Sequence, residues 1–321
     1  KDKHRTVFWS NAFTLKELLS FKNPISLPNG YTIDRFEFND RPLVENKKSE
    51  QTYKLSVIIP TYNNGDHLLN KCFNSLRRSS LFNEMEIIIV DDGSTDDYTP
   101  KIVNRLERKY KNVKAFFFND GGSGSASRPR NKGFLLSTSP YITYLDPDNE
   151  AINDGYYELY QQLNNGNYDL VIGNMLRIDT KHVNFDYYRT AIQYNGSDVI
   201  SKNVKDYLVR SQFKAMSIQA LICKREVIGN HNLKMVEGAA GQDTIFFQEL
   251  LLHSKKTKVI NLQIHIYYAA VSGSTVNTIS KRFFEKYYIL ESYRVKMLKD
   301  NHLLEDYMEK RFEYYFTNWY L

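Results

Sequence analysis

Two aspartates separated by one residue are the strongest candidates for chemistry in this sequence, within the segment Asp146-Pro147-Asp148-Asn149. Two carboxylates at that spacing can share a hard divalent cation such as Mg²⁺ or Mn²⁺, which prefers oxygen ligands. Such a cation would bind a diphosphate and neutralise the charge on a leaving group. The alternative is an Asp-Pro turn in which Asn149 caps the helix that follows.

A second acidic pair, Asp91-Asp92, follows the apolar run 85–90 and precedes a polar stretch at 93–96 (GSTD). Two adjacent acids repel each other unless they bind something. A carboxylate at this place can accept hydrogen bonds from a ring N–H or from ribose hydroxyls. The competing interpretation is that a residue of 93–96 caps the next helix, which still leaves Asp92 available for a ligand.

Glycines and arginines gather in residues 121–124 (GGSG) and 128–131 (RPRN). Glycine permits positive φ and a close approach of the backbone to a ligand. Arginines ahead of a helix N-terminus favour an anion such as a diphosphate. The pattern is neither a Walker motif, because no Gly-Lys-Ser/Thr follows, nor a dinucleotide fingerprint. The alternative is a flexible surface loop.

Three further segments carry weaker signals. Residues 60–63 (PTYN) follow a predicted strand and can place backbone amides and a ring against a base, or form a simple turn. Asp243, at a loop–helix junction in 241–244 (GQDT), can be a general base or a helix cap. Residues 265–277 pair an aromatic strand with a Ser/Gly/Thr loop that can close over a diphosphate, and His265 is expected to be structural.

These motifs share one feature, since most of them follow a predicted β-strand. Apolar, β-branched runs at 55–60 (LSVIIP) and 85–90 (MEIIIV) predict buried parallel strands, and helical spacing over 66–78 predicts a helix between them. Strands that alternate with helices imply right-handed βαβ units, whose ligands bind beyond the carboxyl ends of the strands. The other predicted elements are helices at 99–110, 129–136, 151–163 and 242–253, and strands at 113–118, 141–145, 169–173 and within 259–270.

The chain divides into three parts on sequence grounds. Residues 1–52 are an N-terminal extension of unknown role, with a helix expected at 14–20 and a weak strand at 31–38. Residues 53–279 carry all the motifs. Residues 280–321 contain no Pro or Gly and predict a basic, aromatic helical segment. This segment is expected to pack on the preceding domain and to lead into a further domain, with oligomer assembly or contact with an anionic membrane as alternatives.

Composition restricts the class of partner. The 321 residues carry a formal charge of +6, which suits a small anionic ligand or an anionic membrane surface and does not call for nucleic acid. No apolar stretch approaches the roughly 20 residues of a membrane span, and no signal peptide is visible. Cys72 and Cys223 lack metal-type spacing and are expected to be buried, reduced thiols. We therefore expect a cytoplasmic protein, peripheral at the inner face of the cell membrane.

The ordered set of motifs resembles the family 2 glycosyltransferases over roughly residues 54–275. The set comprises LSVIIPTYN, IIIVDDGSTD, a Gly-rich loop ending in PRN, a DXD-type pair and a late Asp before a helix. The Gly-rich loop combined with the late Gln242-Asp243 pair is most similar to bacterial wall teichoic acid N-acetylglucosaminyltransferases. The resemblance implies a GT-A fold, an α/β architecture with a Rossmann-like, mainly parallel central sheet flanked by helices.

The same resemblance implies an activity and a role for each candidate residue. The implied reaction is a metal-dependent, inverting transfer of GlcNAc or another hexose from a UDP-sugar to a hydroxyl of a bacterial cell-surface glycopolymer, glycan or glycoprotein. The implied metal is Mn²⁺ or Mg²⁺. Pro60, Thr61 and Tyr62 would line the nucleotide pocket, Asp92 would bind the uracil ring, Gly122, Arg130 and Asn131 would face the diphosphate or sugar, Asp146 and Asp148 would form the metal motif with Asp148 the direct ligand, and Asp243 would be the catalytic base.

The sequence departs from the family pattern at two positions, and two other functions stay open. Gln242 stands where many relatives have Glu, and Pro147 stiffens the metal motif. The Gln-x-x-Arg-Trp signature of processive synthases is absent. A nucleotidyltransferase usually has a Gly-rich loop with Arg and Lys after its first strand, where this chain has residues 61–63 (TYN). A non-catalytic nucleotide-sugar-binding module is disfavoured because every expected carboxylate is present.

Overall fold

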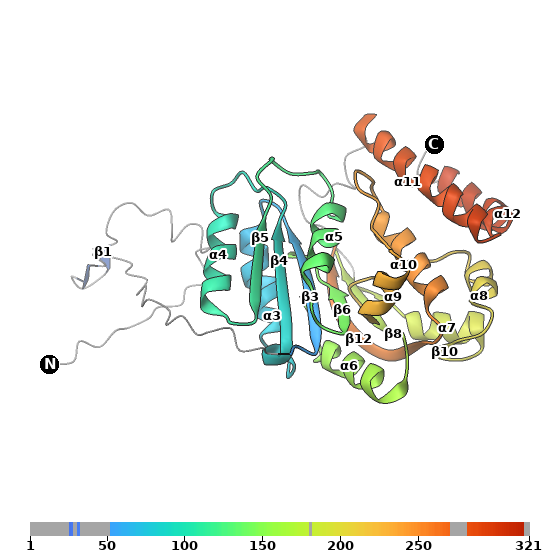
Figure 1. The fold of residues 1–321 in the computed structure, drawn as a ribbon, viewed down its shortest axis with the longest axis horizontal. Helices are drawn as coiled ribbons and strands as arrows, with labels where there is room; N and C mark the ends of the chain where they lie inside the picture. Colours follow the sequence, from blue (N-terminus) through green and yellow to red (C-terminus); the bar gives the residue numbers. More distant parts are fainter. Residues whose placement is uncertain (1–25, 28–30, 33–51, 180–181, 270–280, 318–321) are drawn as a thin grey trace. The chain divides into compact units, whose positions relative to one another are not determined.

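A computed structural model describes residues 26–27, 31–32, 52–179, 182–269 and 281–317 (Figure 1). The chain divides into two units, Lys1–Gln51 and Thr52–Leu321. In the first unit, β1 (Ser26–Leu27) pairs antiparallel with β2 (Tyr31–Thr32). The helix expected at 14–20 lies outside the described residues, as does most of the strand expected at 31–38.

The second unit is built on a large curved sheet with the strand order β10-β12-β8-β11-β6-β3-β4-β5. Two short strands lie off this path, because β7 pairs with β12 and β9 pairs with β8. The strands are β3 (Leu55–Thr61), β4 (Met85–Asp91), β5 (Val113–Phe117), β6 (Tyr141–Tyr144), β7 (Glu150–Ala151), β8 (Leu170–Ile178), β9 (His182–Phe185), β10 (Val199–Ile200), β11 (Leu221–Lys224) and β12 (Thr257–Tyr268).

Helices cover this sheet, as the alternating pattern predicts. The helical stretch after β3 is continuous but contains a π-helical segment, so it comprises α2, η1 and α3. The helices are α2 (Gly65–His67), η1 (Leu68–Phe73), α3 (Asn74–Leu76), η2 (Phe82–Glu84), α4 (Thr99–Lys109), α5 (Ser127–Leu136), α6 (Gly155–Gly166), α7 (Tyr187–Asn195), α8 (Val204–Arg210), α9 (Arg225–Asn230), α10 (Gln242–His253), α11 (Lys281–Asp300), α12 (Leu304–Tyr307), η3 (Met308–Phe312) and α13 (Glu313–Tyr315).

The helix-flanked α/β sheet is confirmed. Its strands pair in parallel within the block β6-β3-β4-β5 and between β8 and β12. Between β6 and β8 lies β11, which runs antiparallel to both, so the whole sheet is mixed. Within the parallel block the chain first moves from β3 to β4 to β5 and then returns to β6 on the far side of β3. The strand order therefore reverses between β3 and β6, and the carboxyl ends of strands at such a switch point are where open α/β sheets bind ligands.

Burial on both faces explains the composition of the central strands. All seven residues of β3 and all seven of β4 are buried, because helices cover both faces of a parallel sheet. Helix α5 approaches β3 so closely that a Cβ atom on Gly133 would lie 2.3 Å from Ile58 Cγ2. A side chain at that position would separate the helix from the strand, so this glycine fixes the height of α5 above the sheet.

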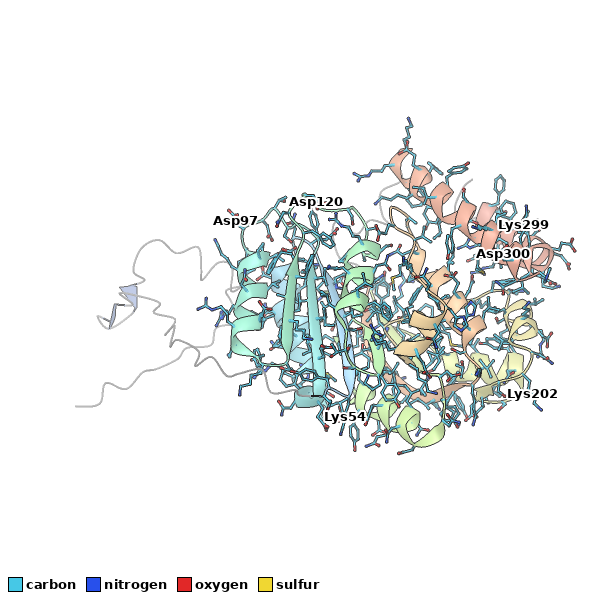
Figure 2. The ribbon with its side chains drawn as sticks, viewed as in Figure 1. Lys54, Asp97, Asp120, Lys202, Lys299 and Asp300 are labelled. Carbon is cyan, nitrogen blue, oxygen red and sulfur yellow. The ribbon has the colours of Figure 1, made fainter. Side chains whose placement is uncertain are left out.

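The strands of the parallel block begin at one edge of the sheet and end at the other. Lys54, ahead of β3, lies at one edge, whereas Asp97 and Asp120 lie at the opposite edge (Figure 2). We call this second edge, at which β3, β4 and β6 end, the carboxyl edge. The predicted helical character of the C-terminal segment is confirmed over the described part by α11 to α13. Among the described residues, no helix is long and apolar enough to cross a bilayer.

Candidate active site

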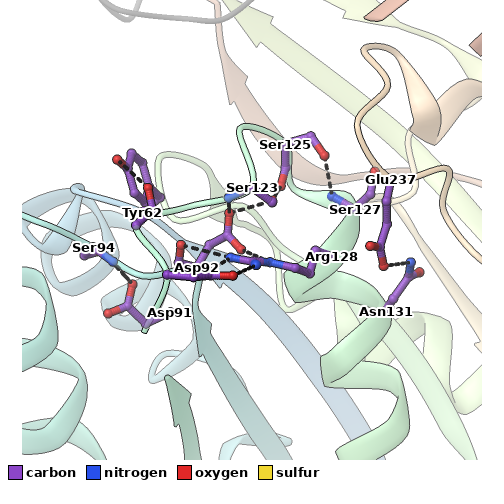
Figure 3. Close-up of polar contacts among 12 residues, drawn as sticks. Tyr62, Asp91, Asp92, Ser94, Ser123, Ser125, Ser127, Arg128, Asn131 and Glu237 are labelled. Atoms are coloured by element: carbon purple, nitrogen blue, oxygen red, sulfur yellow. Dashed lines mark hydrogen bonds and ion pairs between the residues drawn. The ribbon is translucent and has the colours of Figure 1, made fainter. Parts of the chain in front are cut away.

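The carboxyl edge of the sheet brings together the segments that the sequence singles out. β3 ends at Thr61, β4 at Asp91 and β6 at Tyr144. Because β3 is parallel to both β4 and β6, the residues that follow these strands emerge side by side. Figure 3 shows the part of this edge around Asp92. The loops of the site are therefore neighbours in space although they are far apart in the sequence.

The loop after β3 is braced against the loop after β4. Asn63 has a φ of 50°. Its backbone N–H donates to Ser94 Oγ at 2.9 Å, and its side-chain oxygen accepts from the backbone N–H of Thr95 at 2.7 Å. Pro60 and Thr61, both predicted to line a nucleotide pocket, lie at the end of β3 and are buried. They anchor the start of this loop to the sheet.

Tyr62 is the exposed member of the same motif, with 43% of its surface accessible. Its ring rests against Gly122, where a Cβ atom would lie only 2.6 Å from Tyr62 Cε2. The φ angles of Gly121 and Gly122 are 79° and 92°, a region that other residues rarely adopt. The ring and the Gly-rich segment 121–124, which we call the Gly loop, therefore form one surface.

The two adjacent aspartates after β4 point to different partners. Asp91 is buried and accepts hydrogen bonds from the backbone N–H and the hydroxyl of Ser94, at 3.0 and 2.6 Å. Burial raises the pKa of the Asp91 carboxyl. Asp96 caps α4 by accepting from the backbone N–H of Thr99 at 2.9 Å. The helix-cap interpretation thus holds for Asp96, and Asp92 is left to face the Gly loop.

Asp92 is held by two neighbours in this structure (Figure 3). One carboxylate oxygen accepts from the backbone N–H and hydroxyl of Ser123, at 2.8 and 2.7 Å. The other accepts from Arg128 Nε at 2.8 Å, and the same guanidinium binds Asp120 and lies 4.0 Å from the centre of the Phe118 ring. Asp92 is thus 4% exposed and preorganised by charge-assisted hydrogen bonds.

The buried guanidinium of Arg130 forms an ion pair with the half-buried carboxylate of Asp146. An Nη atom of Arg130 donates to one carboxylate oxygen of Asp146. The other oxygen accepts from the side-chain amide of Gln219 at 2.9 Å, and the Gln219 carbonyl oxygen accepts from the backbone N–H of Asp146. Only 5% of the Arg130 side chain is exposed, and its Nε has no partner among the described residues. Both oxygens of Asp146 are therefore engaged.

The DXD-type segment forms a turn. The backbone N–H of Asn149 donates to the carbonyl of Asp146 at 3.1 Å. The Asn149 side chain also joins Gln219 to the backbone N–H of Tyr268 on β12. Asn149 therefore ties the turn to β12 and to the segment before β11 instead of capping a helix, and the short strand β7 follows it.

Asp148 is the carboxylate of this turn that suits a cation. No other described residue donates a hydrogen bond to it, and burial together with the nearby Asp146 raises its pKa to about 6. A carboxylate destabilised by burial and a like charge gains from a bound divalent cation. Among the described residues, no cluster of three or more His, Cys, Asp or Glu side chains has a metal-binding arrangement. A divalent cation at this turn would need further oxygen ligands from outside these side chains.

Asp243 is the second residue of α10, which begins at Gln242 directly after Gly241 with its φ of 74°. Its side chain is exposed to solvent but surrounded closely enough that desolvation raises its pKa. The charge of Arg130 lowers this pKa and that of Asp146 raises it, so the three groups lie within electrostatic reach of one another. The structure thus brings Arg130, Asp146, Asp148 and Asp243 to one place.

Asn131, which is predicted to face the diphosphate or sugar, contacts the segment before Asp243. Its side-chain amide donates to the backbone carbonyl of Met235 at 2.9 Å and to Glu237 at 3.0 Å, and its oxygen accepts from the Met235 N–H. Ser127 donates to the carbonyl of Val236. These bonds fasten the segment that leads to Asp243 onto α5, so Asn131 here positions this segment.

Two structural expectations are confirmed. His265 is fully buried, its Nε2 lies 3.0 Å from Ser217 Oγ, and burial lowers its pKa to about 4. Cys72 and Cys223 are buried free thiols. Neither cysteine lies in a metal-binding arrangement.

Sequence reasoning missed Gln219, which binds both the backbone and the carboxylate of Asp146. It also missed the pairing of Arg128 with Asp92. No motif marks Gln219, because it precedes an apolar run that predicts only a buried strand, and its contact lies 73 residues away along the chain.

Comparison with known proteins places these motifs in a family. Residues 56–221 match the sequence model described as Glycosyl transferase family 2. The poly(ribitol-phosphate) beta-N-acetylglucosaminyltransferase TarP of Staphylococcus aureus (strain N315) is 30% identical over 207 residues, covering 64% of this chain and 60% of TarP. The glycosyltransferase GlyG of Streptococcus pneumoniae serotype 4 is 26% identical over 229 residues, covering 70% of this chain and 73% of GlyG.

The fold is shared with a solved structure. Residues 1–349 of S. aureus TarS in complex with UDP-GlcNAc match with a TM-score of 0.67 at 18% identity, covering 83% of this chain and 74% of that one. This likeness shows the same arrangement of helices and strands. The alignment with TarP spans about three fifths of the length of that relative.

The pKa of Asp148 makes stability depend on pH. In the unfolded chain this carboxyl ionises near its ordinary value of 3.8, whereas in the folded protein it holds its proton to about pH 6. The folded state therefore binds more protons between these values, and its stability falls as pH rises through them. We compare the free energies of unfolding of the parent protein and of Asp148→Asn. The parent value minus the variant value should fall from about pH 4 to pH 6 and then level off. Urea unfolding across this range measures the difference, and a difference that rises with pH would contradict the assignment.

Proposed function

This chain belongs to glycosyl transferase family 2 and is a glycosyltransferase, and we propose that it transfers N-acetylglucosamine from UDP-GlcNAc to a hydroxyl of a cell-surface glycopolymer. The donor is supported by the UDP-GlcNAc bound to the similarly folded TarS. The acceptor class is supported by the poly(ribitol-phosphate) substrate in the name of TarP. The observation that carries the proposal is the convergence of Arg130, Asp146, Asp148 and Asp243 beside the loop of Asp92.

The nucleotide is proposed to bind across the loops after β3 and β4. Tyr62 offers an exposed ring, and Gly122 lies directly against it. Asp92 lies at the rim of this surface with its oxygens already oriented by Ser123 and Arg128. A uracil N–H and ribose hydroxyls are donors that such a carboxylate accepts. The diphosphate would then extend toward the buried guanidinium of Arg130.

A divalent cation, Mn²⁺ or Mg²⁺, fits this proposal at Asp148. When bound there it would supply positive charge that neutralises the departing diphosphate. Asp146 is proposed to act indirectly, because Arg130 and Gln219 occupy both of its carboxylate oxygens. One carboxylate, that of Asp148, would then bind the cation directly.

Asp243 is proposed to be the general base. An acceptor hydroxyl ionises far above neutral pH and needs a proton acceptor at the moment of attack. The hydroxyl oxygen would form its bond to the anomeric carbon as the bond from that carbon to the UDP oxygen breaks. The proton would move to the Asp243 carboxylate, and the bonding electrons would leave with UDP. A single displacement of this kind inverts the anomeric centre. The raised pKa of Asp243 makes it a stronger base, and Arg130 would stabilise the departing charge.

The remaining sequence-based interpretations stay predictions. We propose residues 53–279 as the catalytic domain, and the cytoplasm as the compartment because both thiols are free. The C-terminal helices expose apolar side chains, among them Phe284 and Tyr288 on α11. Assembly of copies through these helices and contact with an anionic membrane are both compatible with this surface.

The reaction is tested by incubating the protein with UDP-GlcNAc, a synthetic ribitol-phosphate oligomer and Mn²⁺ or Mg²⁺. We expect release of UDP together with a mass increase of the oligomer by one N-acetylhexosamine. UDP-glucose serves as the competing donor. Release of pyrophosphate would instead indicate a nucleotidyltransferase, and binding without turnover would indicate a non-catalytic module.

The base assignment predicts a specific loss of turnover. Asp243→Asn should lower kcat by about 10²- to 10⁴-fold, because the proton acceptor is lost, while the affinity for UDP changes little. Asp169→Asn is the matched control, since Asp169 pairs with Lys224 near the start of β8, away from the carboxyl edge. Near-normal turnover in Asp243→Asn would remove this residue from the base role.

The contact between Tyr62 and Gly122 predicts a difference between two neighbouring glycines. Gly121→Ala and Gly122→Ala should each cost about 1–2 kcal/mol of stability, because both glycines have positive φ. Only Gly122→Ala also displaces the Tyr62 ring, since nothing lies within 4 Å of a Cβ at Gly121. Titration calorimetry should therefore show weaker UDP binding in Gly122→Ala than in Gly121→Ala. Equal affinities would exclude the Tyr62 ring from the nucleotide site.

A further inference from the structure

Two cations of the C-terminal helix α11 converge on the Gly loop. Lys286 Nζ donates to the carbonyl oxygen of Gly124 at 2.5 Å. A Cβ atom on Gly124 would lie 3.0 Å from Arg282 Nη2 and 3.6 Å from Lys286 Nζ. Both head groups are therefore within contact distance of one glycine, and a side chain there would displace them. The closeness of the backbone depends on Gly124, whose φ is 77°.

No carboxylate among the described residues neutralises this pair. The acids on the same helix have other partners, because Glu285 lies 3.8 Å from Lys281 and Glu291 pairs with Arg294. Burial and the charge of Arg282 lower the pKa of Lys286. Arg282 is exposed and Lys286 is half-buried. Two like charges held this close repel each other, and an anion between them would remove that repulsion.

The position of this pair relates it to the active site. Gly124 directly follows Ser123, whose backbone N–H donates to Asp92. It lies two residues after Gly122, the glycine that contacts the Tyr62 ring. Farther along, α11 contacts the other side of the site. Its Ile289 and Leu290 approach Gly238 and Gly241, in the loop before Asp243, where Cβ atoms would lie 3.7 and 3.5 Å from their side chains. The helix thus spans the Gly loop and the loop of the proposed base.

We propose that Arg282 and Lys286, together with the Gly loop, form a phosphate-binding subsite. This inference rests on the proposed function, which provides two sources of the same chemistry. One is the diphosphate of the UDP-sugar, and the other is a phosphodiester of an alditol-phosphate acceptor. Arg offers a planar pair of N–H donors to phosphate oxygens, and Lys offers a compact charge. Lys286, which now donates to the backbone carbonyl of Gly124, would then donate to a phosphate oxygen of the ligand.

The test compares Arg282→Ala, Lys286→Ala and the double variant with Lys299→Ala. Lys299 lies at the opposite end of the same helix (Figure 2) and is exposed. The two probes are UDP and a synthetic ribitol-phosphate oligomer, each titrated calorimetrically at low and at moderate salt. We expect the double variant to bind one probe roughly 10- to 100-fold more weakly, with a shallower dependence of affinity on salt. Loss of UDP affinity assigns the subsite to the donor, and loss of oligomer affinity assigns it to the acceptor.

The proposal is overturned if the double variant binds both probes within about twofold of Lys299→Ala, a difference of less than 0.5 kcal/mol. Circular dichroism confirms that the variants fold, and Arg282→Gln/Lys286→Gln, which keeps the length and polarity of the side chains, replaces the alanine pair if they do not. Turnover of UDP-GlcNAc by the parent protein tests the proposed function separately. A parent protein that binds UDP or the oligomer through this pair but transfers no sugar would refute that function and leave the subsite supported.

Discussion

The ion pair between the buried Arg130 and the half-buried Asp146 is the interaction on which the rest of the site depends. A guanidinium that is 5% exposed requires a carboxylate partner, because an unpaired buried charge costs several kcal/mol. Asp146 in turn is oriented by Gln219, so neither of its oxygens is free. This leaves Asp148 as the carboxylate with room for a cation. The same guanidinium lowers the pKa of Asp243, which otherwise rises through desolvation and the charge of Asp146. This ion pair therefore engages Asp146, leaves Asp148 available for a cation and lowers the pKa of Asp243.

The topology of the sheet explains why these groups meet. The chain reverses its direction of travel across the sheet after β5, and the reversal opens the carboxyl ends of β3 and β6 toward the same space. Asp92 and the Gly loop approach from one side of this space, and the DXD-type turn approaches from the other. β11 then pairs antiparallel with β6 and delivers Gln219 beneath the turn. Backbone pairing thus places the acids, and hydrogen bonds to distant side chains fix their orientation.

Local sequence patterns were sufficient for much of this fold. Apolar β-branched runs predicted β3 and β4, and helical spacing predicted α10 at its observed bounds. The acids that follow successive predicted strands were also expected to lie together, because parallel strands end at the same edge of a sheet. The antiparallel insertion of β11 was not predictable, because a strand of only four residues carries no information about its direction in the sheet. The partners of Asn131 were equally hidden, since its bonds to Met235 and Glu237 join segments more than a hundred residues apart. The spacing of residue types predicts which residues belong to one helix or strand. Contacts between distant segments depend on how the helices and strands pack.

The acids of the site differ in how well the protein satisfies them, and this difference has a physical consequence. Asp92 and Asp146 already accept hydrogen bonds from protein donors, so a ligand gains at them only what exceeds the bonds it replaces. Asp148 and Asp243 both have raised pKa values because protein and neighbouring charge surround them without neutralising them. A cation or a proton stabilises these two groups directly. Asp92 and Asp146 therefore contribute mainly by their fixed orientation. Asp148 and Asp243 are destabilised as carboxylates, so binding a cation or a proton lowers their free energy.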